Sequence, residues 1–299
     1  MILVTGGNGF VGARLVARLV AEGERPRALV RAAATSNGWP AESVEIVTGD
    51  TTRPATLDAA VAGVATIIHT AFVTADRKER TGVNYYATNV EGTANLVAAA
   101  KRAGVGRIIV LSGLGTVPAR PGSYMQGRYL AVQEVRNSGL AYSILGPSIL
   151  FGPGAAFFKG LADLIRKVPV VPMIGSGNRR FQPVYVEDVV TCLLKMAREP
   201  EQYDGKSIDI GGPDILTYAR ILDLLMDTLH IHKPKVPGPT PFAYLGAAVM
   251  EALLPKPPIT VAALGLFAFD NTTDLDSVPR HFGFAPAALA PYLAEHGLN

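Results

Sequence analysis

The sequence contains a single cysteine, Cys192, among its 299 residues. One cysteine excludes disulfide bonds within the chain, and it argues against a metal cluster held by thiolates. Cys192 lies in the apolar run VVTCLLKMA, where a free cysteine usually packs as a small core residue. We therefore interpret it as a buried structural thiol, and no metal site is predicted.

Long apolar runs are also absent. The most apolar stretches are FAYLGAAVM and ITVAALGLFAF, and both are much shorter than the ~20 residues that span a bilayer. Glu251 and several prolines interrupt them, which favours core or cleft-lining helices, while peripheral contact with a membrane surface stays open. A strand pattern that begins at Ile2 leaves no room for a signal peptide. A cytoplasmic protein without a transmembrane segment is expected.

The sequence has no strong excess of charge of either sign. Its formal net charge is +3, and its lysines and arginines are spread along the chain, so no nucleic-acid surface is predicted. Apolar residues make up 48% and charged residues 18%, with 31 glycines and 22 prolines. This composition is typical of a compact globular protein with many tight turns. The expected partner is a small-molecule substrate, and the chain is expected to be a monomer or a homodimer.

Short β-branched runs alternate with longer amphipathic runs through the first half of the chain. The predicted strands are ILVTG, RALVR, VEIV, ATIIHT, GRIIVLS and AYSILG. This alternation predicts an α/β fold with a doubly wound parallel sheet of the Rossmann type. We assign residues 1–150 and 181–211 to this dinucleotide-binding domain. Residues 151–180 and 212–299, which are more often broken by proline, are assigned to a smaller, mainly helical substrate-binding or cap region.

A glycine-rich segment, VTGGNGFVGARL, joins the first predicted strand to the first predicted helix. Its glycines allow the main chain to approach a pyrophosphate, whose charge would meet the N–H groups at the start of the helix. Gly12 would let the helix and the strand pack closely. The short pattern alone does not distinguish between dinucleotide-binding subclasses. The residues predicted to bind the cofactor here are Gly6, Gly7, Asn8, Gly9, Phe10, Val11 and Gly12.

The end of the second predicted strand bears on the choice of cofactor. Arg31 would pair with the 2′-phosphate of NADP(H), whereas an acidic residue there would favour NAD(H). We therefore favour NADP(H), with NAD(H) and a solvated Arg31 as the alternatives. Arg25 and Arg27, which lie close by, are interpreted as solvated surface residues. Asp50, which precedes Thr51 in the cofactor-binding set, is expected either to accept a hydrogen bond from the adenine amino group or to cap a helix.

Several longer segments are similar to one known superfamily. They are TGGNGFVG at 5–12, HTA at 69–71, NVEGTANLVAAAKRAGVGRIIVLS at 89–112 and PVYVEDVV at 183–190. With these segments the chain resembles a short-chain dehydrogenase/reductase of the extended or atypical type, which is NAD-dependent epimerase/dehydratase-like. Two later segments, IGGPDILTYARILDLL and PKPPITVAALGLFAFDN, resemble the branch that includes the complex I accessory-subunit-like proteins.

The resemblance implies where the cofactor lies. Thr70 and Ala71, followed by Phe72, would border it after the fourth strand. Asn89 would support the sheet near the active site. The turn from Pro147 to Ile149 would pass beside the nicotinamide.

The resemblance also implies a catalytic pair. In SYMQGRYLAVQEV, Tyr124 and Arg128 match the tyrosine and lysine of such enzymes, and Ser112 begins the serine motif as a donor on the oxyanion side. In such enzymes the tyrosine exchanges a proton with the substrate oxygen while a hydride moves to or from nicotinamide. The lysine lowers the pKa of that tyrosine and holds the nicotinamide ribose, so the resemblance also implies that Tyr124 and Arg128 contact the cofactor. A free tyrosine has a pKa near ~10, and a fixed cation one helical turn away favours the phenolate. The alternative is an ordinary pair on a helix surface.

Three positions depart from the family pattern. Arg128 replaces the lysine, and its planar guanidinium is not equivalent to an ammonium. Gly113 replaces a second serine or threonine, and Gly146 replaces an arginine that often precedes the proline. Our preferred hypothesis is an NADP(H)-dependent oxidoreductase for a mostly apolar carbonyl or alcohol. A non-catalytic NAD(P)-binding scaffold or redox sensor, and an epimerase or dehydratase with tightly bound cofactor, are the alternatives.

A few other side chains could belong to a site. His69 ends a strand, and a core histidine with satisfied hydrogen bonds is favoured over one that faces the cofactor. Arg179 and Arg180 either bind an anionic group or lie in a solvated turn. An apolar or aromatic substrate would follow if several aromatic and methionine residues line the cleft, although core packing explains each alone. These residues are Phe72, Met125, Phe151, Phe157, Phe158 and Met173.

Overall fold

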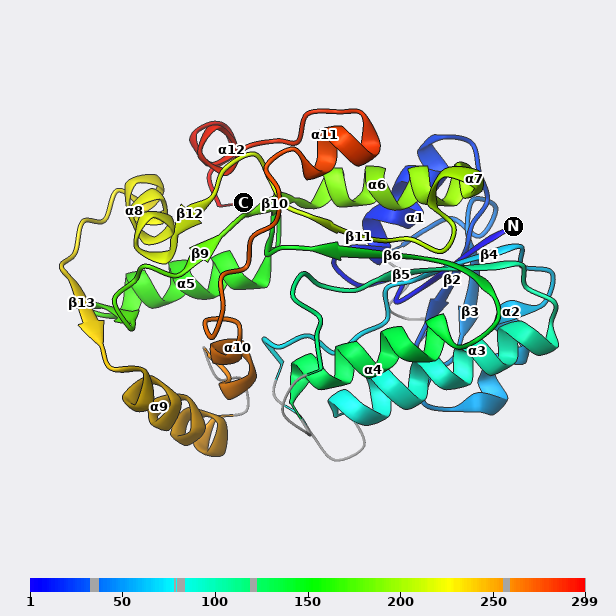
Figure 1. Cartoon of the computed structure of the whole chain (residues 1–299), viewed down its shortest axis with the longest axis horizontal. Coiled ribbons are helices and arrows are strands. Elements are labelled where there is room, and N and C mark those ends of the chain that lie inside the picture. The colour runs from blue at the N-terminus through cyan, green and yellow to red at the C-terminus, as the bar shows by residue number, and fades with distance from the viewer. Residues whose placement is uncertain (33–37, 78, 80–83, 119–122, 255–258, 299) are drawn as a thin grey trace. The chain divides into compact units, whose positions relative to one another are not determined.

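The computed structural model describes residues 1–32, 38–77, 79, 84–118, 123–254 and 259–298. The chain divides into two compact units (Figure 1). The first unit comprises residues 1–74, 79–146 and 189–208, and the second comprises 75–78, 147–188 and 209–299.

A seven-stranded sheet supports the first unit, and its strand order is β11-β6-β5-β4-β1-β2-β3. The pairs β1–β2, β1–β4, β2–β3, β4–β5 and β5–β6 are parallel. The strands are β1 (Ile2–Thr5), β2 (Arg27–Val30), β3 (Glu45–Thr48), β4 (Thr66–His69), β5 (Arg107–Leu111), β6 (Ala141–Pro147) and β11 (Ser207–Ile210). Each predicted strand is present, and the predicted α/β fold with a doubly wound parallel sheet is confirmed.

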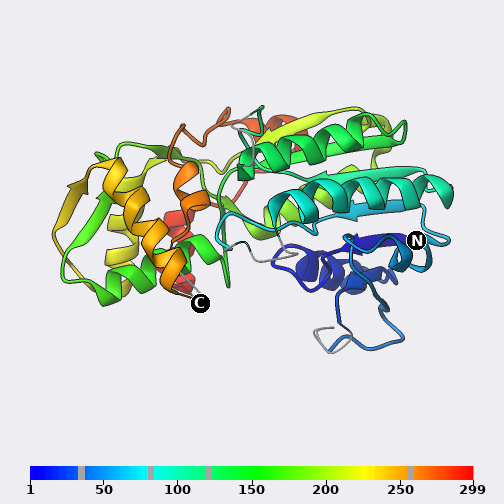
Figure 2. The same ribbon diagram turned by 90° about the horizontal axis from the view of Figure 1, so that it is seen from below.

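Helices cover both faces of this sheet. Figure 1 shows α3 and α4 on one face and α1 and α6 on the other, and Figure 2 also shows α3 and α4 side by side. The elements between the strands are α1 (Gly12–Ala21), η2 (Pro54–Thr56), α2 (Asp58–Val61), the π-helix η3 (Tyr86–Glu91), α3 (Gly92–Arg102), α4 (Tyr124–Arg136), α6 (Val186–Arg198) and α7 (Pro200–Tyr203). At the ends of α1 and α6, Arg198 forms ion pairs with Glu22 and Glu24.

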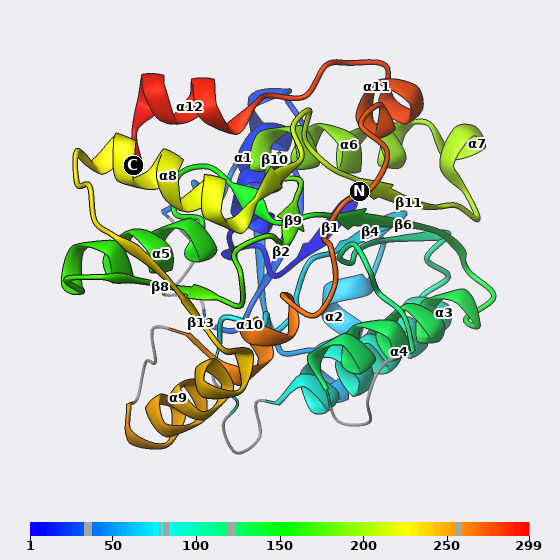
Figure 3. The same cartoon turned by 60° about the vertical axis from the view of Figure 1, so that its left-hand side comes forward.

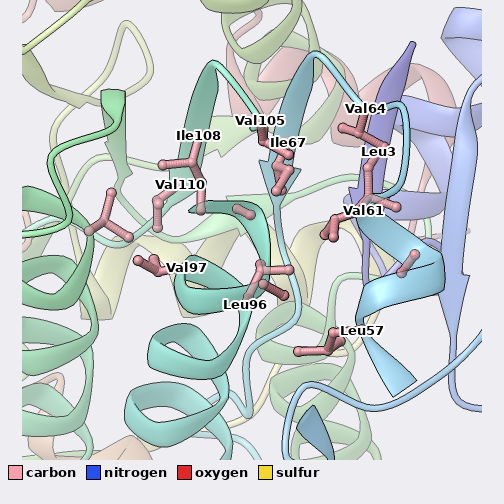
Figure 4. Close-up of a cluster of buried hydrophobic side chains, with 14 of the residues drawn as sticks. Leu3, Leu57, Val61, Val64, Ile67, Leu96, Val97, Val105, Ile108 and Val110 are labelled. Carbon is pink, nitrogen blue, oxygen red and sulfur yellow. The ribbon is translucent and has the colours of Figure 1, made fainter. Parts of the chain in front are cut away.

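Apolar side chains of the strands and of the helices on one face of the sheet form a buried cluster. Every residue of β5 is buried, because a strand in a doubly covered parallel sheet has no solvent face. Figure 4 shows this cluster between β1, β4, β5, α2 and α3. Its labelled members are Leu3, Leu57, Val61, Val64, Ile67, Leu96, Val97, Val105, Ile108 and Val110.

The strand order reverses beside β1, so a ligand site is expected there. The chain builds β1, β2 and β3 in one direction and then returns to add β4 on the other side of β1. The last residues of β1 and β4, Thr5 and His69, lie opposite one another. Ligands of open α/β sheets bind at the carboxyl ends of the strands where the order reverses. The loops that begin at Gly6 and Thr70 leave the sheet at this point.

The second unit contains short strand pairs and helices. Its strands are β7 (Leu150–Phe151), β8 (Val171–Ile174), β9 (Arg180–Phe181), β10 (Val184–Tyr185), β12 (Leu216–Thr217) and β13 (Lys235–Gly238). Its helices are α5 (Ala156–Lys167), α8 (Tyr218–Leu229), α9 (Thr240–Leu253), α10 (Val261–Gly265), α11 (Ser277–Phe282) and α12 (Leu289–His296). Figure 3 shows β13 beside β8, with which it pairs in parallel.

Several aromatic and methionine side chains of the second unit are buried, which weakens the argument that they line a substrate site. Phe151, Phe158 and Met173 are all less than one tenth exposed and belong to the core. Helix α9, in contrast, exposes apolar side chains, with Phe242 71% and Leu253 75% accessible. Within the described residues, no helix has both the length and the apolar character needed to cross a bilayer.

Candidate functional site

The loop between β1 and α1 is packed so tightly that it requires its glycines. Gly6 has a φ of +67°, which favours glycine, and its carbonyl oxygen accepts a hydrogen bond from Gly9 N at 2.8 Å. A Cβ on Gly12 would lie 2.1 Å from that same oxygen. A Cβ on Gly9 would lie 3.0 Å from it. The loop therefore turns sharply against the first residue of α1.

This loop has the properties of a pyrophosphate cradle. The first turn of α1 contains no acidic residue, and no side-chain cap occupies its N-terminus within the described loop. No carboxylate on this turn therefore competes with a phosphate for the main-chain N–H groups or the positive end of the helix dipole. Gly9 is exposed in this loop, while the missing Cβ of the buried Gly12 lets the start of the helix close against Gly6. A dinucleotide phosphate fits the residues that are present.

The segment after β4 packs against the glycine loop. Thr70 Oγ1 donates to the carbonyl oxygen of Thr5 at 2.7 Å, and Thr70 N donates to Thr5 Oγ1 at 3.2 Å. A Cβ on Gly6 would lie 3.0 Å from Ala71 Cα. The structure thus brings Thr70 and Ala71 together with the loop. Their contact with a cofactor stays a prediction.

His69 is fully buried directly behind the loop. Its Nδ1 lies 2.7 Å from Thr5 Oγ1, and its Nε2 lies 3.0 Å from Thr93 Oγ1. Because the Thr93 hydroxyl donates to the carbonyl oxygen of Asn89, Thr93 accepts from Nε2–H, and Nδ1 accepts from Thr5. Burial lowers the pKa of His69 to about 3, and the positive charge of Arg128 adds to this shift. His69 is a neutral, fully hydrogen-bonded core residue, as favoured above.

Asn89 lies in the π-helix η3 and holds the chain that follows β4. Its Oδ1 accepts from Val73 N at 2.8 Å, and its Nδ2 donates to the Val73 carbonyl oxygen at 3.0 Å. Both hydrogen bonds are buried, so they fix the path of the segment that contains Thr70 and Phe72. Asn89 therefore supports this segment with both ends of its amide, and its place in the cofactor site stays a prediction.

The residues expected around the adenosine lie at the ends of β2 and β3. Arg31 is exposed directly after β2. Asp50 Oδ1 accepts hydrogen bonds from both the main-chain N–H and the hydroxyl of Thr52, each at 2.9 Å. Thr51 is buried, and its carbonyl oxygen accepts from Asn95 Nδ2 at 3.0 Å. One Asp50 oxygen is therefore already used in a turn.

Arg27 is not the solvated surface residue that was expected. It is only 7% exposed and lies 2.8 Å from the Glu45 carboxylate. It also donates to the carbonyl oxygens of Ala60 at 2.9 Å and Ala62 at 2.6 Å. The prediction was wrong because Glu45 is its register partner on β3, a pairing that only the folded sheet creates.

A pair of hydroxyls follows β5, and the sequence argument identified only one of them. Ser112 Oγ lies 3.1 Å from Thr116 Oγ1, which itself donates to the carbonyl oxygen of Gly113 at 2.5 Å. Because Thr116 uses its proton in this way, Ser112 donates to Thr116. Thr116 was missed because it lies one turn beyond the serine motif. The only sequence signal for it is its spacing of four residues from Ser112.

Tyr124 and Arg128 meet at the start of α4. Ser123 caps this helix by accepting from Gln126 N at 3.2 Å, which places Tyr124 in the first turn. Arg128 Nη1 donates to Tyr124 Oη at 2.9 Å, and Arg128 Nη2 donates to the carbonyl oxygen of Leu111 at 3.1 Å. Arg128 is 6% exposed. The pair is therefore a partly buried, charge-assisted contact at the carboxyl end of β5, in which Arg128 is buried and Tyr124 is half-buried.

Pro147 and Ile149 belong to the second unit. The Ile149 carbonyl oxygen accepts from Val184 N at 3.0 Å. Between them, Ser148 Oγ donates to Asn271 at 2.7 Å, and Ser148 N donates to Ile210 O at 2.9 Å. This turn is rigid within its own unit, and its role beside a nicotinamide stays a prediction.

Comparison with known proteins identifies a family. The sequence profile of the NAD dependent epimerase/dehydratase family matches residues 2–211, a range that includes the glycine loop and the Tyr124–Arg128 pair. A ceramide reductase from Caulobacter vibrioides is 32% identical over 200 residues, which cover 67% of this chain and 62% of that protein. The mitochondrial NADH dehydrogenase [ubiquinone] 1 alpha subcomplex subunit 9 of Arabidopsis thaliana is 26% identical over 200 residues, covering 66% of this chain and 50% of that protein.

These relatives and one solved structure confirm the resemblance stated from the sequence. The chain spans less than two thirds of the length of the two relatives, at 62% and 50%. A short-chain dehydrogenase/reductase superfamily protein from Agrobacterium tumefaciens, solved with bound NAD, superposes with a TM-score of 0.73 at 21% identity. The match covers 100% of this chain and 96% of that chain, and at this identity it shows a shared fold.

Replacing Gly12 with alanine should disrupt the glycine loop. The new Cβ would overlap the Gly6 carbonyl group, at 2.1 Å from its oxygen, so the loop must move. We expect Gly12→Ala to weaken NADPH binding at least about tenfold, as measured by fluorescence titration. Gly106→Ala is the matched control, because its Cβ would lie 3.6 Å from the nearest atom. Equal affinities in the two variants would contradict this role for the loop.

Protonation of His69 should limit stability in mild acid. Because burial depresses the pKa from 6.5 to about 3, the unfolded chain takes up this proton first as the pH falls. The contribution of neutral His69 is thus complete above about pH 6.5 and is lost below it, at about 1.4 kcal/mol for each pH unit. Urea unfolding of the protein and of His69→Gln should show a stability difference that shrinks below about pH 6.5. Parallel pH profiles would show that the imidazole is not buried in the neutral form.

Proposed function

The chain belongs to the NAD dependent epimerase/dehydratase family, and we propose that it is an NADP(H)-dependent oxidoreductase of the short-chain dehydrogenase/reductase type. Its reaction would be hydride transfer to or from a small or medium, mostly apolar carbonyl or alcohol. Tyr124 would be the acid/base, with Arg128 as its cationic partner. The observation that carries the proposal is the hydrogen bond from Arg128 Nη1 to Tyr124 Oη, 2.9 Å long.

This hydrogen bond leaves the tyrosine proton available for chemistry. A guanidinium has five N–H donors and no acceptor, so the phenol oxygen accepts and its own proton cannot be given to Arg128. That proton can be donated to the carbonyl oxygen of a substrate, and in the reverse reaction the phenolate takes a proton from the hydroxyl of the alcohol. The buried positive charge also stabilises the phenolate that forms when the proton leaves. Arg128 can therefore supply the charge that a lysine supplies in the related enzymes.

The cofactor would lie along the carboxyl edge of the sheet. When bound, its nicotinamide ring supplies or accepts the hydride. The glycine loop, 6–12, would hold the pyrophosphate, and Thr70 and Ala71 lie against that loop. Arg31, exposed after β2, would pair with a 2′-phosphate, which is why NADP(H) is preferred over NAD(H). Asp50, Thr51, Asn89, Pro147 and Ile149 complete the proposed cofactor set.

An apolar substrate is supported by the surroundings of Tyr124. The ring of Tyr85 packs edge-on against the ring of Tyr124, with centroids 5.2 Å apart. Phe72, whose ring lies beside Arg128, and Met125, which follows Tyr124 in the sequence, are both half-buried. Ser112 is proposed as a further donor, although its proton now goes to Thr116. The name of one relative, ceramide reductase, is consistent with a substrate that is mostly apolar.

We further propose that the protein acts in the cytoplasm.

Removing the Tyr124 hydroxyl should stop the reaction without preventing cofactor binding. NADPH oxidation would be followed with 2-octanone, ethyl acetoacetate and benzaldehyde as probes. We expect Tyr124→Phe to lower kcat about a hundredfold or more, which is the usual effect of losing a general acid. Tyr129→Phe, on the same helix, is the control and should retain activity within about twofold.

Other outcomes of this experiment would favour the other hypotheses. Tight NADPH binding without oxidation of any probe would support a non-catalytic scaffold or redox sensor. Nicotinamide that remains bound through purification, with no net redox, would support an epimerase or dehydratase. Turnover that is unchanged in Tyr124→Phe would exclude the proposed mechanism.

Replacing Arg31 should change the choice between the two cofactors. Loss of a charge-assisted contact with the 2′-phosphate should weaken NADPH binding by about tenfold or more in Arg31→Ala, while NADH binding changes by less than about twofold. Fluorescence titration with each cofactor measures this ratio. Arg25→Ala is the control, because Arg25 is held at the surface by the Ala41 carbonyl oxygen. An unchanged ratio of the NADPH and NADH affinities would show that Arg31 does not cause a preference for NADP(H).

A further inference from the structure

The guanidinium of Arg128 lies over two aromatic rings. Its Cζ is 5.1 Å from the ring centroid of Phe72 and 5.6 Å from that of Tyr124. A cation within about 6 Å of a ring centroid is attracted by the negative face of the ring, and the attraction is strongest when the cation is removed from water. Arg128 is 6% exposed. Both contacts therefore act on a desolvated charge.

Two nitrogens of the planar Arg128 guanidinium donate hydrogen bonds. Nη1 donates to Tyr124 Oη, and Nη2 donates to the Leu111 carbonyl oxygen. Nε is buried and has no hydrogen-bond partner within the described part of the chain. A buried donor without a partner is destabilising, and the attraction to the two ring faces offsets part of this cost. A compact ammonium could not span the same two acceptors with a fixed plane.

Phe72 is itself held in position from behind. Its ring packs against the imidazole of His69, with centroids 4.6 Å apart. His69 cannot turn freely because Thr5 and Thr93 bind both of its nitrogens. Phe72 N also donates to the Thr70 carbonyl oxygen at 3.0 Å. The ring that faces Arg128 is thus fixed by the core of the first unit.

Glycine 113 fits the guanidinium from another side. A Cβ on Gly113 would lie 3.5 Å from both Nε and Nη2 of Arg128, which is already van der Waals contact. The change from lysine to Arg128 and the change to Gly113 are therefore compatible parts of one arrangement, in which the guanidinium takes the space next to β5.

We propose that Phe72 is a positioning residue that holds Arg128 against the Tyr124 hydroxyl, and that this ring makes arginine the cation that the site requires. The inference rests on the proposed function for its effect on turnover. Phe72 acts through Arg128: without the ring, the guanidinium loses one of the groups that restrict its rotation. We therefore expect Arg128→Lys to lower turnover strongly only while Phe72 is present.

Nitrogen-15 NMR of arginine-labelled protein tests the positioning without a substrate. Arg128→Lys identifies the Arg128 signals by their disappearance. We expect separate, slowly exchanging Nη signals for Arg128 in the unaltered protein and in Phe72→Tyr, and merged signals in Phe72→Leu. Phe10→Leu is the matched control, because the Phe10 ring centroid lies 4.5 Å from Arg14 Cζ, and its loss should change the Arg14 signals while the Arg128 signals stay unchanged. Arg128 signals that are unchanged in Phe72→Leu would overturn the proposal.

Kinetics with the probe ketones tests the consequence for catalysis. Phe72→Leu should lower kcat about tenfold, the effect expected for loss of a desolvated cation–π contact, whereas Phe72→Tyr, which keeps an aromatic ring beside Arg128, should lower kcat by less. Arg128→Lys should lower kcat about tenfold beside Phe72 and much less in the Phe72→Leu background. Thermal unfolding of each variant identifies any that fails to fold. Equal effects of Arg128→Lys in both backgrounds would show that the two residues act independently.

The two proposals fail in different ways. Turnover that does not depend on Tyr124 would contradict the oxidoreductase mechanism, while the NMR comparison would still decide whether Phe72 holds Arg128. Turnover that depends on Tyr124, together with independent effects at positions 72 and 128, would contradict only the positioning role. Absence of turnover with all probes leaves the NMR result as the deciding measurement.

Discussion

The close backbone contact between Gly6 and Gly12 is the constraint from which the rest of the site follows. A single added carbon on Gly12 would lie 2.1 Å from the Gly6 oxygen, so β1, its loop and α1 can meet only in this way. Ala71 closes against the same turn, which brings the end of β4 to the loop. Because the strand order reverses between β1 and β4, this contact also places the N-terminus of α1 where open α/β sheets bind their ligands.

A second constraint is the burial of one positive charge beside this edge. Arg128 is removed from water, and its charge is offset by the Leu111 carbonyl oxygen, the Tyr124 hydroxyl and two ring faces. The same charge helps to keep His69 neutral. Four side chains therefore form one connected set. The His69 imidazole packs on the Phe72 ring, that ring lies beside the Arg128 guanidinium, and Arg128 donates to the Tyr124 hydroxyl. The family departures at positions 113 and 128 are consistent with one another within this set.

Much of the fold could be predicted because its signals are local in the sequence. The alternation of apolar strands with amphipathic helices is a property of neighbouring residues, and it indicated the doubly wound sheet. Arg27 shows the limit of this approach. Its partner Glu45 is opposite it only because β2 and β3 pair in that register. Thr116 was missed for a similar reason, since its bond to Ser112 depends on how the chain turns after β5.

The sequence by itself determined the glycine loop, the doubly wound parallel sheet, and the spacing that puts Tyr124 and Arg128 on one helical face. These features follow from turn and helix geometry, which depends on residues within a few positions of one another. Only the tertiary structure decided that His69 is a neutral core residue, that Asn89 holds the segment after β4, and that Phe72 lies under Arg128. These contacts join residues such as Thr5 and His69, 64 positions apart. Their partners are chosen by packing and by the exclusion of water, which no local pattern records.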